Sequence, residues 1–177
     1  MTTGFTYAEV GATDTRDRAP FPPAGFRALE REAVVGRGRG AFERSASAVR
    51  HWEVQRRSGM RVDRDGEGEV RAGESVTLRI PFGPFRVSAP ARVVYVVDEP
   101  RTAGFAYGTL AGHPEIGEEA FMVHWDADDR VVFRVRAFWR ASGQWRLVLP
   151  AVRLAQLVYT RRYLRVLSGA STTGSVD

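Results

Sequence analysis

The stretch "GFAYGTLAGHPEIGEEAF", residues 104–121, contains two strand-like runs that are joined by a short turn. In the first run, Phe105 and Tyr107 alternate with small residues, and "EAFMVHWD", residues 119–126, forms the second run. A period of two is typical of a half-buried β-strand. The Gly-His-Pro-Glu sequence between the runs is rich in turn-forming residues. The stretch therefore predicts a hairpin of two antiparallel strands.

Strand patterns continue on both sides of this hairpin. "SVTLRI", residues 75–80, alternates apolar and polar side chains, and "ARVVYVVDEP", residues 91–100, is a nearly continuous β-branched run. In "RVVFRVRAFWRAS", residues 130–142, an apolar face alternates with an arginine face. The apolar face holds Val131, Phe133, Val135 and Ala137, and the face that we expect to be solvated holds Arg134, Arg136 and Arg140. "GFRALEREAVVGRG", residues 25–38, predicts a further strand at the beginning of the domain.

Two segments have helical periodicity. In "GAFERSASAVRHWEV", residues 40–54, one apolar stripe contains Phe42, Ala46, Val49 and Trp52. "QWRLVLPAVRLAQLVYTRRYLRVL", residues 144–167, predicts a long helix that Pro150 either opens or kinks. Residues 1–24 predict an extended lead-in with turns, and residues 55–75, which are polar and rich in glycine, predict loops.

The order of these elements predicts an α+β fold. A strand and a helix are followed by a series of antiparallel strands and one long C-terminal helix, without the βαβ alternation of a parallel sheet. The apolar face of an antiparallel sheet must be covered, and the long helix is the obvious cover. We therefore expect a curved antiparallel sheet that grips the C-terminal helix, in one domain over residues 1–167 with a disordered tail over residues 168–177. A space between sheet and helix would suit a ligand.

Composition narrows the classes of function. The net charge is +5, but the 26 basic residues are all arginines that are spread along the chain and interleaved with 21 acids, so we expect no nucleic-acid partner. The absence of cysteine excludes disulfides and thiolate chemistry. We find no signal-peptide pattern and no apolar run long enough to span a membrane, and we expect a cytoplasmic protein.

Candidates for acid–base chemistry gather in the hairpin. A histidine and carboxylates near one another can transfer protons, which makes His113, Glu118 and Glu119 candidate catalytic residues. Glu118 and Glu119 are adjacent, so on a strand they point to opposite faces. Glu119 shares parity with Phe121 and therefore points inward if that face is the core. The alternative is a polar hairpin loop in which His113 makes only local hydrogen bonds.

Aromatic side chains on the strands and the last helix are candidates for lining a ligand site as well as for the core. With His113 and Glu119 at the mouth, the candidate ligand-binding residues are Tyr95, Tyr107, Phe121, Phe133, Trp139 and Tyr159. The histidines and acids are too few, and at no known spacing, for a metal site. We predict neither a metal nor a cofactor.

Several of these segments together resemble the DUF1990 (UPF0548) family. They are "FTYAEVGAT", "PPAGFR" before "GRGRGAFERSASAV", "ARVVYVVDEP", the hairpin stretch, and "TRRYLRVL", which together span residues 4–167. The resemblance implies the START/Bet v 1-like (SRPBCC) helix-grip superfamily, whose members bind lipids, hormones or polyketides between sheet and terminal helix. It implies no particular activity for this family.

Three functions are compatible with this interpretation. The first is binding of a hydrophobic small molecule or lipid in a cavity between sheet and C-terminal helix. The second is an enzyme on the same scaffold, of a cyclase, dehydratase or hydrolase type, that uses His113 and a glutamate. The third is a protein-interaction module with a filled core. The sequence leaves the ligand, the existence of a catalytic activity and the oligomeric state open.

Overall fold

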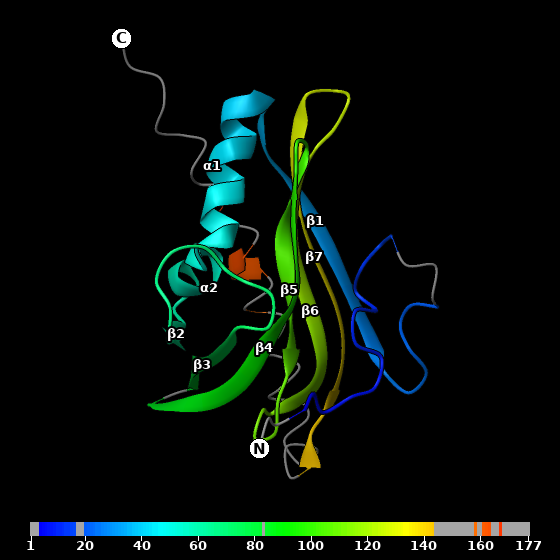
Figure 1. Ribbon diagram of the computed structural model, residues 1–177, viewed down its shortest axis with the longest axis vertical. Coiled ribbons are helices and arrows are strands. Elements are labelled where there is room, and N and C mark those ends of the chain that lie inside the picture. Colours follow the sequence, from blue (N-terminus) through cyan, green and yellow to red (C-terminus); the bar gives the residue numbers. More distant parts are fainter. Residues whose placement is uncertain are drawn as a thin grey trace.

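The computed structural model describes residues 4–16, 20–82 and 84–143, together with residues 158, 161–163 and 167. Seven strands form one antiparallel sheet in the order β1-β7-β6-β5-β4-β3-β2 (Figure 1). The strands are β1 (Arg27–Arg37), β2 (Arg61–Arg64), β3 (Ser75–Phe82), β4 (Phe85–Glu99), β5 (Thr102–Thr109), β6 (Glu115–Trp125) and β7 (Arg130–Ala141). The predicted α+β class and the curved antiparallel sheet are confirmed.

The helices α1 (Gly38–Arg50) and α2 (Glu53–Arg57) cover the side toward which the sheet curls, which we call the concave face (Figure 1). The sequence predicted one helix over residues 40–54, but Trp52 adopts a left-handed backbone conformation with φ 61° and separates the two helices. The predicted apolar stripe is nevertheless buried from Phe42 to Trp52. The break lets the chain turn and bury Trp52 completely against the sheet.

The C-terminal segment contributes to the same core. Residues 158, 161–163 and 167 are helical, and Tyr163 and Leu167 are buried in the main hydrophobic cluster. The ring of Tyr163 meets the ring of Phe121 edge-on, with centroids 5.2 Å apart. The rest of the long helix predicted over residues 144–167, and the predicted tail over residues 168–177, lie outside the described residues.

The N-terminal segment, residues 4–16 and 20–26, packs on the opposite side of the sheet, which we call the outer face (Figure 1). Phe138 is completely buried there, and the rings of Tyr7 and Phe26 lie 5.4 and 5.0 Å from its ring. The outer face is thus partly covered, and the arginine side of β7 is less solvated than its alternation predicts. The side chain of Arg136 is only 17% exposed.

Two local features differ from the sequence-based expectation. Residues 55–75 were predicted to be loops, but they contain the C-terminal half of α2 and the short strand β2, which pairs with β3. The pairing of β4 with β5 shifts between Val93 and Tyr95, so the strand's parity changes within its β-branched run. In the described part of the chain, none of the helices is both long and apolar enough to cross a lipid bilayer.

Candidate functional site

The centre of the concave face is a group of aromatic side chains on three adjacent strands. Phe105 on β5 lies opposite Phe121 on β6. Phe133 lies on the next strand, β7, and its ring stacks on that of Phe121. The ring centroids of Phe105 and Phe121 are 5.9 Å apart, and those of Phe121 and Phe133 are 6.4 Å apart. All three side chains are completely buried. The alternation of each strand therefore places a continuous apolar surface beneath the helices.

A carboxyl group is built into this apolar surface. Glu119 pairs across the strands with Tyr107, whose hydroxyl donates a hydrogen bond of 2.6 Å to the Glu119 carboxyl. Burial raises the pKa of Glu119 to about 7, and the hydrogen bond from Tyr107 opposes that rise. Among the described residues, no basic side chain forms an ion pair with Glu119. This carboxyl group is thus poised between its neutral and charged forms near physiological pH.

A second carboxyl group, Glu115, lies on the same strand and shares the parity of Glu119. Burial, and then the negative charge of Glu119, raises the pKa of Glu115 to about 8. In the described part of the chain, the Glu115 side chain has no hydrogen-bond or ion-pair partner. Two neighbouring half-buried acids, of which the charge of one disfavours ionisation of the other, are typical of functional sites.

His113 lies in the turn between β5 and β6 and is buried. Its Nδ1 lies 3.0 Å from the backbone nitrogen of Glu115 and 3.1 Å from the backbone carbonyl oxygen of the same residue, so the ring bonds to the backbone of the turn in either tautomer. Burial lowers the pKa of His113 to about 4, so the ring is neutral at pH 7. Within the described residues, His113 makes no contact with the carboxyl group of Glu119. The observed role of this ring is to fix the turn.

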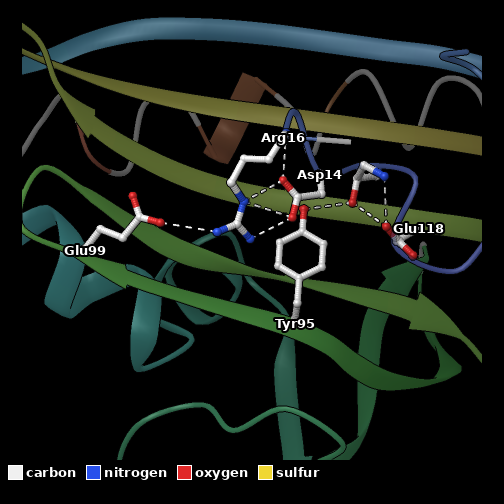
Figure 2. A network of polar contacts seen from close by, with 6 residues as sticks. Asp14, Arg16, Tyr95, Glu99 and Glu118 are labelled. Atoms are coloured by element: carbon white, nitrogen blue, oxygen red, sulfur yellow. Dashed lines mark hydrogen bonds and ion pairs between the residues drawn. The ribbon is translucent and has the colours of Figure 1, made fainter. Parts of the chain in front are cut away.

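Glu118, the other predicted candidate of the pair, points to the outer face. Its carboxylate accepts hydrogen bonds from the hydroxyl of Tyr7 (2.8 Å), the backbone N–H of Gly11 (2.8 Å) and the backbone N–H of Thr13 (3.0 Å), and also from the Thr13 hydroxyl. Figure 2 shows this carboxylate at the end of a polar network that includes Asp14 and Arg16. Glu118 therefore anchors the N-terminal segment and lies away from the concave face.

The structure brings together some of the residues that the sequence nominated for ligand binding. Tyr107, Glu119, Phe121 and Phe133 form one group, and Trp139 shares their face of the sheet at the end of β7, with Arg27 5.9 Å from its ring. Tyr95 is separate, because the shift in β4 turns it to the outer face, where its hydroxyl lies 3.0 Å from that of Thr13. Tyr159 lies outside the described residues.

Residues that sequence reasoning did not nominate complete the helical side of the site. The ring of Trp52 lies 4.5 Å from that of Phe105 and 5.8 Å from that of Tyr107. Trp52 and Gln55 are completely buried, yet the Trp52 Nε1 and both polar atoms of the Gln55 amide have no hydrogen-bond partner in the described structure. Trp52 belonged to the predicted apolar stripe, whereas Gln55 lay in a polar run that offered no signal of burial.

The described residues form no group of three or more histidine and acidic side chains that is suited to hold a metal ion. The chemical resources of the concave face are therefore aromatic surface, two acids of raised pKa, a tyrosine hydroxyl, and the buried donors and acceptor on Trp52 and Gln55. These groups can hold a mostly apolar molecule by one or two hydrogen bonds.

Solved structures share the fold that the sequence resemblance implied. Norcoclaurine synthase from Thalictrum flavum matches with a TM-score of 0.57 at 12% identity, over 86% of this chain and 90% of that chain. Major latex-like protein 151 from Panax ginseng matches with a TM-score of 0.55 at 14% identity, over 82% of this chain and 97% of that chain. Identities this low establish the fold alone, which is the START/Bet v 1-like helix-grip fold.

Sequence relatives and a family model give the closer assignment. A UPF0548 protein of Deinococcus radiodurans is 33% identical over 177 residues, which cover 94% of this chain and 87% of the relative. A UPF0548 protein of Arabidopsis thaliana is 28% identical over 145 residues, which cover 77% of this chain and 69% of the relative. The model of the domain of unknown function DUF1990 matches residues 6–166. The chain therefore belongs to the DUF1990 family, as its sequence segments predicted.

Proposed function

We propose that the protein binds a hydrophobic small molecule, aromatic or lipid-like, between the concave face of the sheet and the C-terminal segment. The observation that carries this proposal is the carboxyl group of Glu119 within an aromatic surface, with one hydrogen bond, from Tyr107, in the described structure. A half-buried carboxyl group without a cation loses part of its hydration, and a group that hydrogen-bonds to it offsets that cost. A ligand that carries a hydrogen-bond donor would satisfy that need.

The expected ligand has a flat or aliphatic body and one polar end. The body would lie on Phe121 and Phe133, whose rings are part of the buried aromatic row. A hydroxyl or amino group would donate to Glu119. The amide of Gln55, which has both a donor and an acceptor, is available for a second polar group on the helical side.

A fold neighbour supports ligands of this kind. The structure of norcoclaurine synthase is a complex with dopamine and hydroxybenzaldehyde, two small aromatic molecules. Aromatic ligands suit the ring-lined concave face of the present chain because offset and edge-on ring contacts are favourable.

Native mass spectrometry of the protein, purified from the organism that naturally produces it, tests the proposal. We expect a small molecule to remain bound, and we expect Glu119→Gln and Tyr107→Phe to lower its occupancy. Glu118→Gln is the matched control, because it changes the neighbouring carboxylate on the opposite face of the same strand. Repeated preparations without any bound molecule, together with no thermal shift from a panel of lipids and aromatic compounds, would refute it and favour an interaction module.

The two acids of raised pKa favour a second candidate, an enzyme on the same scaffold. A general base works best when its pKa is near the working pH, and the pKa values of Glu119 and Glu115 are about 7 and about 8. In this case Glu119 would exchange a proton with the bound molecule, and the Nε2 atom of neutral His113 would form a hydrogen bond with it. Incubation of the identified molecule with the protein and analysis of its mass and connectivity would separate the two candidates. Conversion that is lost in Glu119→Gln supports an enzyme, and an unchanged molecule supports a carrier.

A further inference from the structure

A groove of about 540 Å³ lies on the outer face, between the N-terminal segment and strands β4 to β7. Its apolar surface comes from Val97, Ala120, Met122 and Val132. Asp14, Arg16, Tyr95 and Glu99 border it on the side that Figure 2 shows. The volume is in the range of small-molecule sites, which is roughly 300–1,000 Å³. The groove is distinct from the proposed concave-face site, because Ala120 and Met122 alternate with Glu119 and Phe121 along β6.

Most of the charge that lines this groove is already neutralised within the protein. Three of the four lining arginines are paired: Arg16 with Asp14 (2.7 Å) and Glu99 (3.2 Å), Arg130 with Asp126 (2.9 Å), and Arg134 with Glu32 (2.9 Å). These pairs also occupy the lining acids, so the groove has little net attraction for a cation. The four lining arginines and the four lining acids balance in formal charge, and the fourth arginine differs from the others in its hydrogen bonding.

Arg136 is that fourth arginine, and its environment is different. Its guanidinium carbon lies 3.7 Å from the centre of the Phe21 ring, and its side chain is 17% exposed. The nearest carboxylate oxygen, on Glu30, is 3.8 Å from its Nη1, beyond hydrogen-bond distance. Among the described residues, the guanidinium makes no hydrogen bond, and its Nε is buried without a partner. A cation this far removed from water is stabilised by an anion that hydrogen-bonds to it.

We propose that the groove is a second ligand site, which takes a small organic acid with an apolar body. The carboxylate pairs with the Arg136 guanidinium, whose planar fork matches a carboxylate and whose ring contact with Phe21 holds it in place. The apolar body lies on Ala120, Met122 and Val132. Arg136 selects for an anion because its guanidinium, unlike those of the other lining arginines, makes no hydrogen bond to a carboxylate among the described residues.

The three methionines of the chain provide a direct test, because two of them report on different faces. Met122 lines the groove, whereas Met60 belongs to the core cluster beneath the concave face and its sulfur lies 3.7 Å from the Tyr163 hydroxyl. We would label the methionine methyl groups with ¹³C in the full chain and titrate it with hexanoate. Hexylamine, which has the same apolar body and the opposite charge, is the control ligand. We expect the Met122 signal to shift with hexanoate and to remain unchanged with hexylamine.

Two substitutions on β7 make the test specific to Arg136. Arg136→Gln is expected to weaken hexanoate binding about 10- to 100-fold, since it removes a charge-assisted pair. Arg140→Gln is the matched control: Arg140 lies on the same face of the same strand, 4.6 Å from the ring of Phe26, and does not line the groove. It should leave the affinity unchanged. Val132→Phe, which fills the groove and keeps every charge, should abolish binding, and it provides an independent test if Arg136→Gln does not fold.

Several outcomes would overturn the proposal. They are a Met122 signal that hexanoate leaves unchanged, an equal response to hexylamine, and equal affinity in the wild-type protein and in folded Arg136→Gln. A shift of Met60 without Met122 would also overturn it, and would instead place the carboxylate on the concave face. Failure of the concave-face proposal leaves this site intact, because the two faces share none of the reporting groups.

Discussion

Replacement of Glu118 by alanine should detach the N-terminal segment from the outer face. Glu118 is 3% exposed, and its carboxylate accepts hydrogen bonds from Tyr7, Gly11 and Thr13. A hydrogen bond to a charged group contributes about 1.5–3 kcal/mol, but the separate contributions are not additive. Once the segment separates, its donors bind water, so the loss cannot exceed what the segment gains by docking. We therefore expect Glu118→Ala to lower the free energy of unfolding by about 3–5 kcal/mol.

Urea denaturation followed by circular dichroism measures this loss, and amide hydrogen exchange locates it. Exchange at the Gly11 and Thr13 amides should accelerate, while exchange at the central strand amides should change only by the global loss of stability. Glu118→Gln keeps one accepting oxygen and should have an intermediate effect. A change in unfolding free energy below about 0.5 kcal/mol, or unchanged exchange at Gly11, would refute the assignment of Glu118 as the anchor.

Two further predictions concern the concave face and the hairpin. The pKa of Glu119 is about 7 in the fold against a usual value of 4.5, so the favourable protonated form is present below about pH 4.5 and is lost as the pH rises through about 7. Glu119→Gln, which stays neutral, should therefore be more stable than wild type by up to about 3 kcal/mol at pH 8.5, and the difference should vanish near pH 4.5. Thermal unfolding of both proteins across this pH range tests the prediction. A difference in stability that is independent of pH contradicts it. Gly117→Ala should destabilise the protein by about 3 kcal/mol or more, since a Cβ at Gly117 would lie 2.0 Å from the carbonyl oxygen of Phe138; a change in unfolding free energy below about 1 kcal/mol would show that the strands separate easily there.

The sequence was sufficient to predict the antiparallel sheet and the inward direction of the Glu119 side chain. The alternation in residues 104–110 and 130–142 corresponds to β5 and β7. Successive side chains of a strand point to opposite faces of the sheet, and here one face is more buried than the other. The same parity argument placed Glu119 with Phe121, as the structure shows. Local periodicity carries this information since each strand has one face in the core.

Other features depended on contacts between distant residues. The turn of Tyr95 to the outer face comes from a register shift in β4, and a β-branched run contains no local sign of it. The break at Trp52 replaces a regular helix because burial of that ring against Phe105 outweighs the local preference of the backbone. The anchoring of Thr13 by Glu118 joins residues 105 positions apart, which no periodicity can reveal.

The most direct test of the proposed function is the position of a bound molecule on the concave face. The compound identified by native mass spectrometry would be returned to the isotope-labelled protein, and nuclear Overhauser effects between compound and protein would be measured. We predict contacts from the compound to the ring protons of Phe121 and Phe133, and loss of those contacts in Glu119→Gln. Contacts confined to the methyl group of Met122 on the outer face, or contacts that persist unchanged in Glu119→Gln, would contradict it.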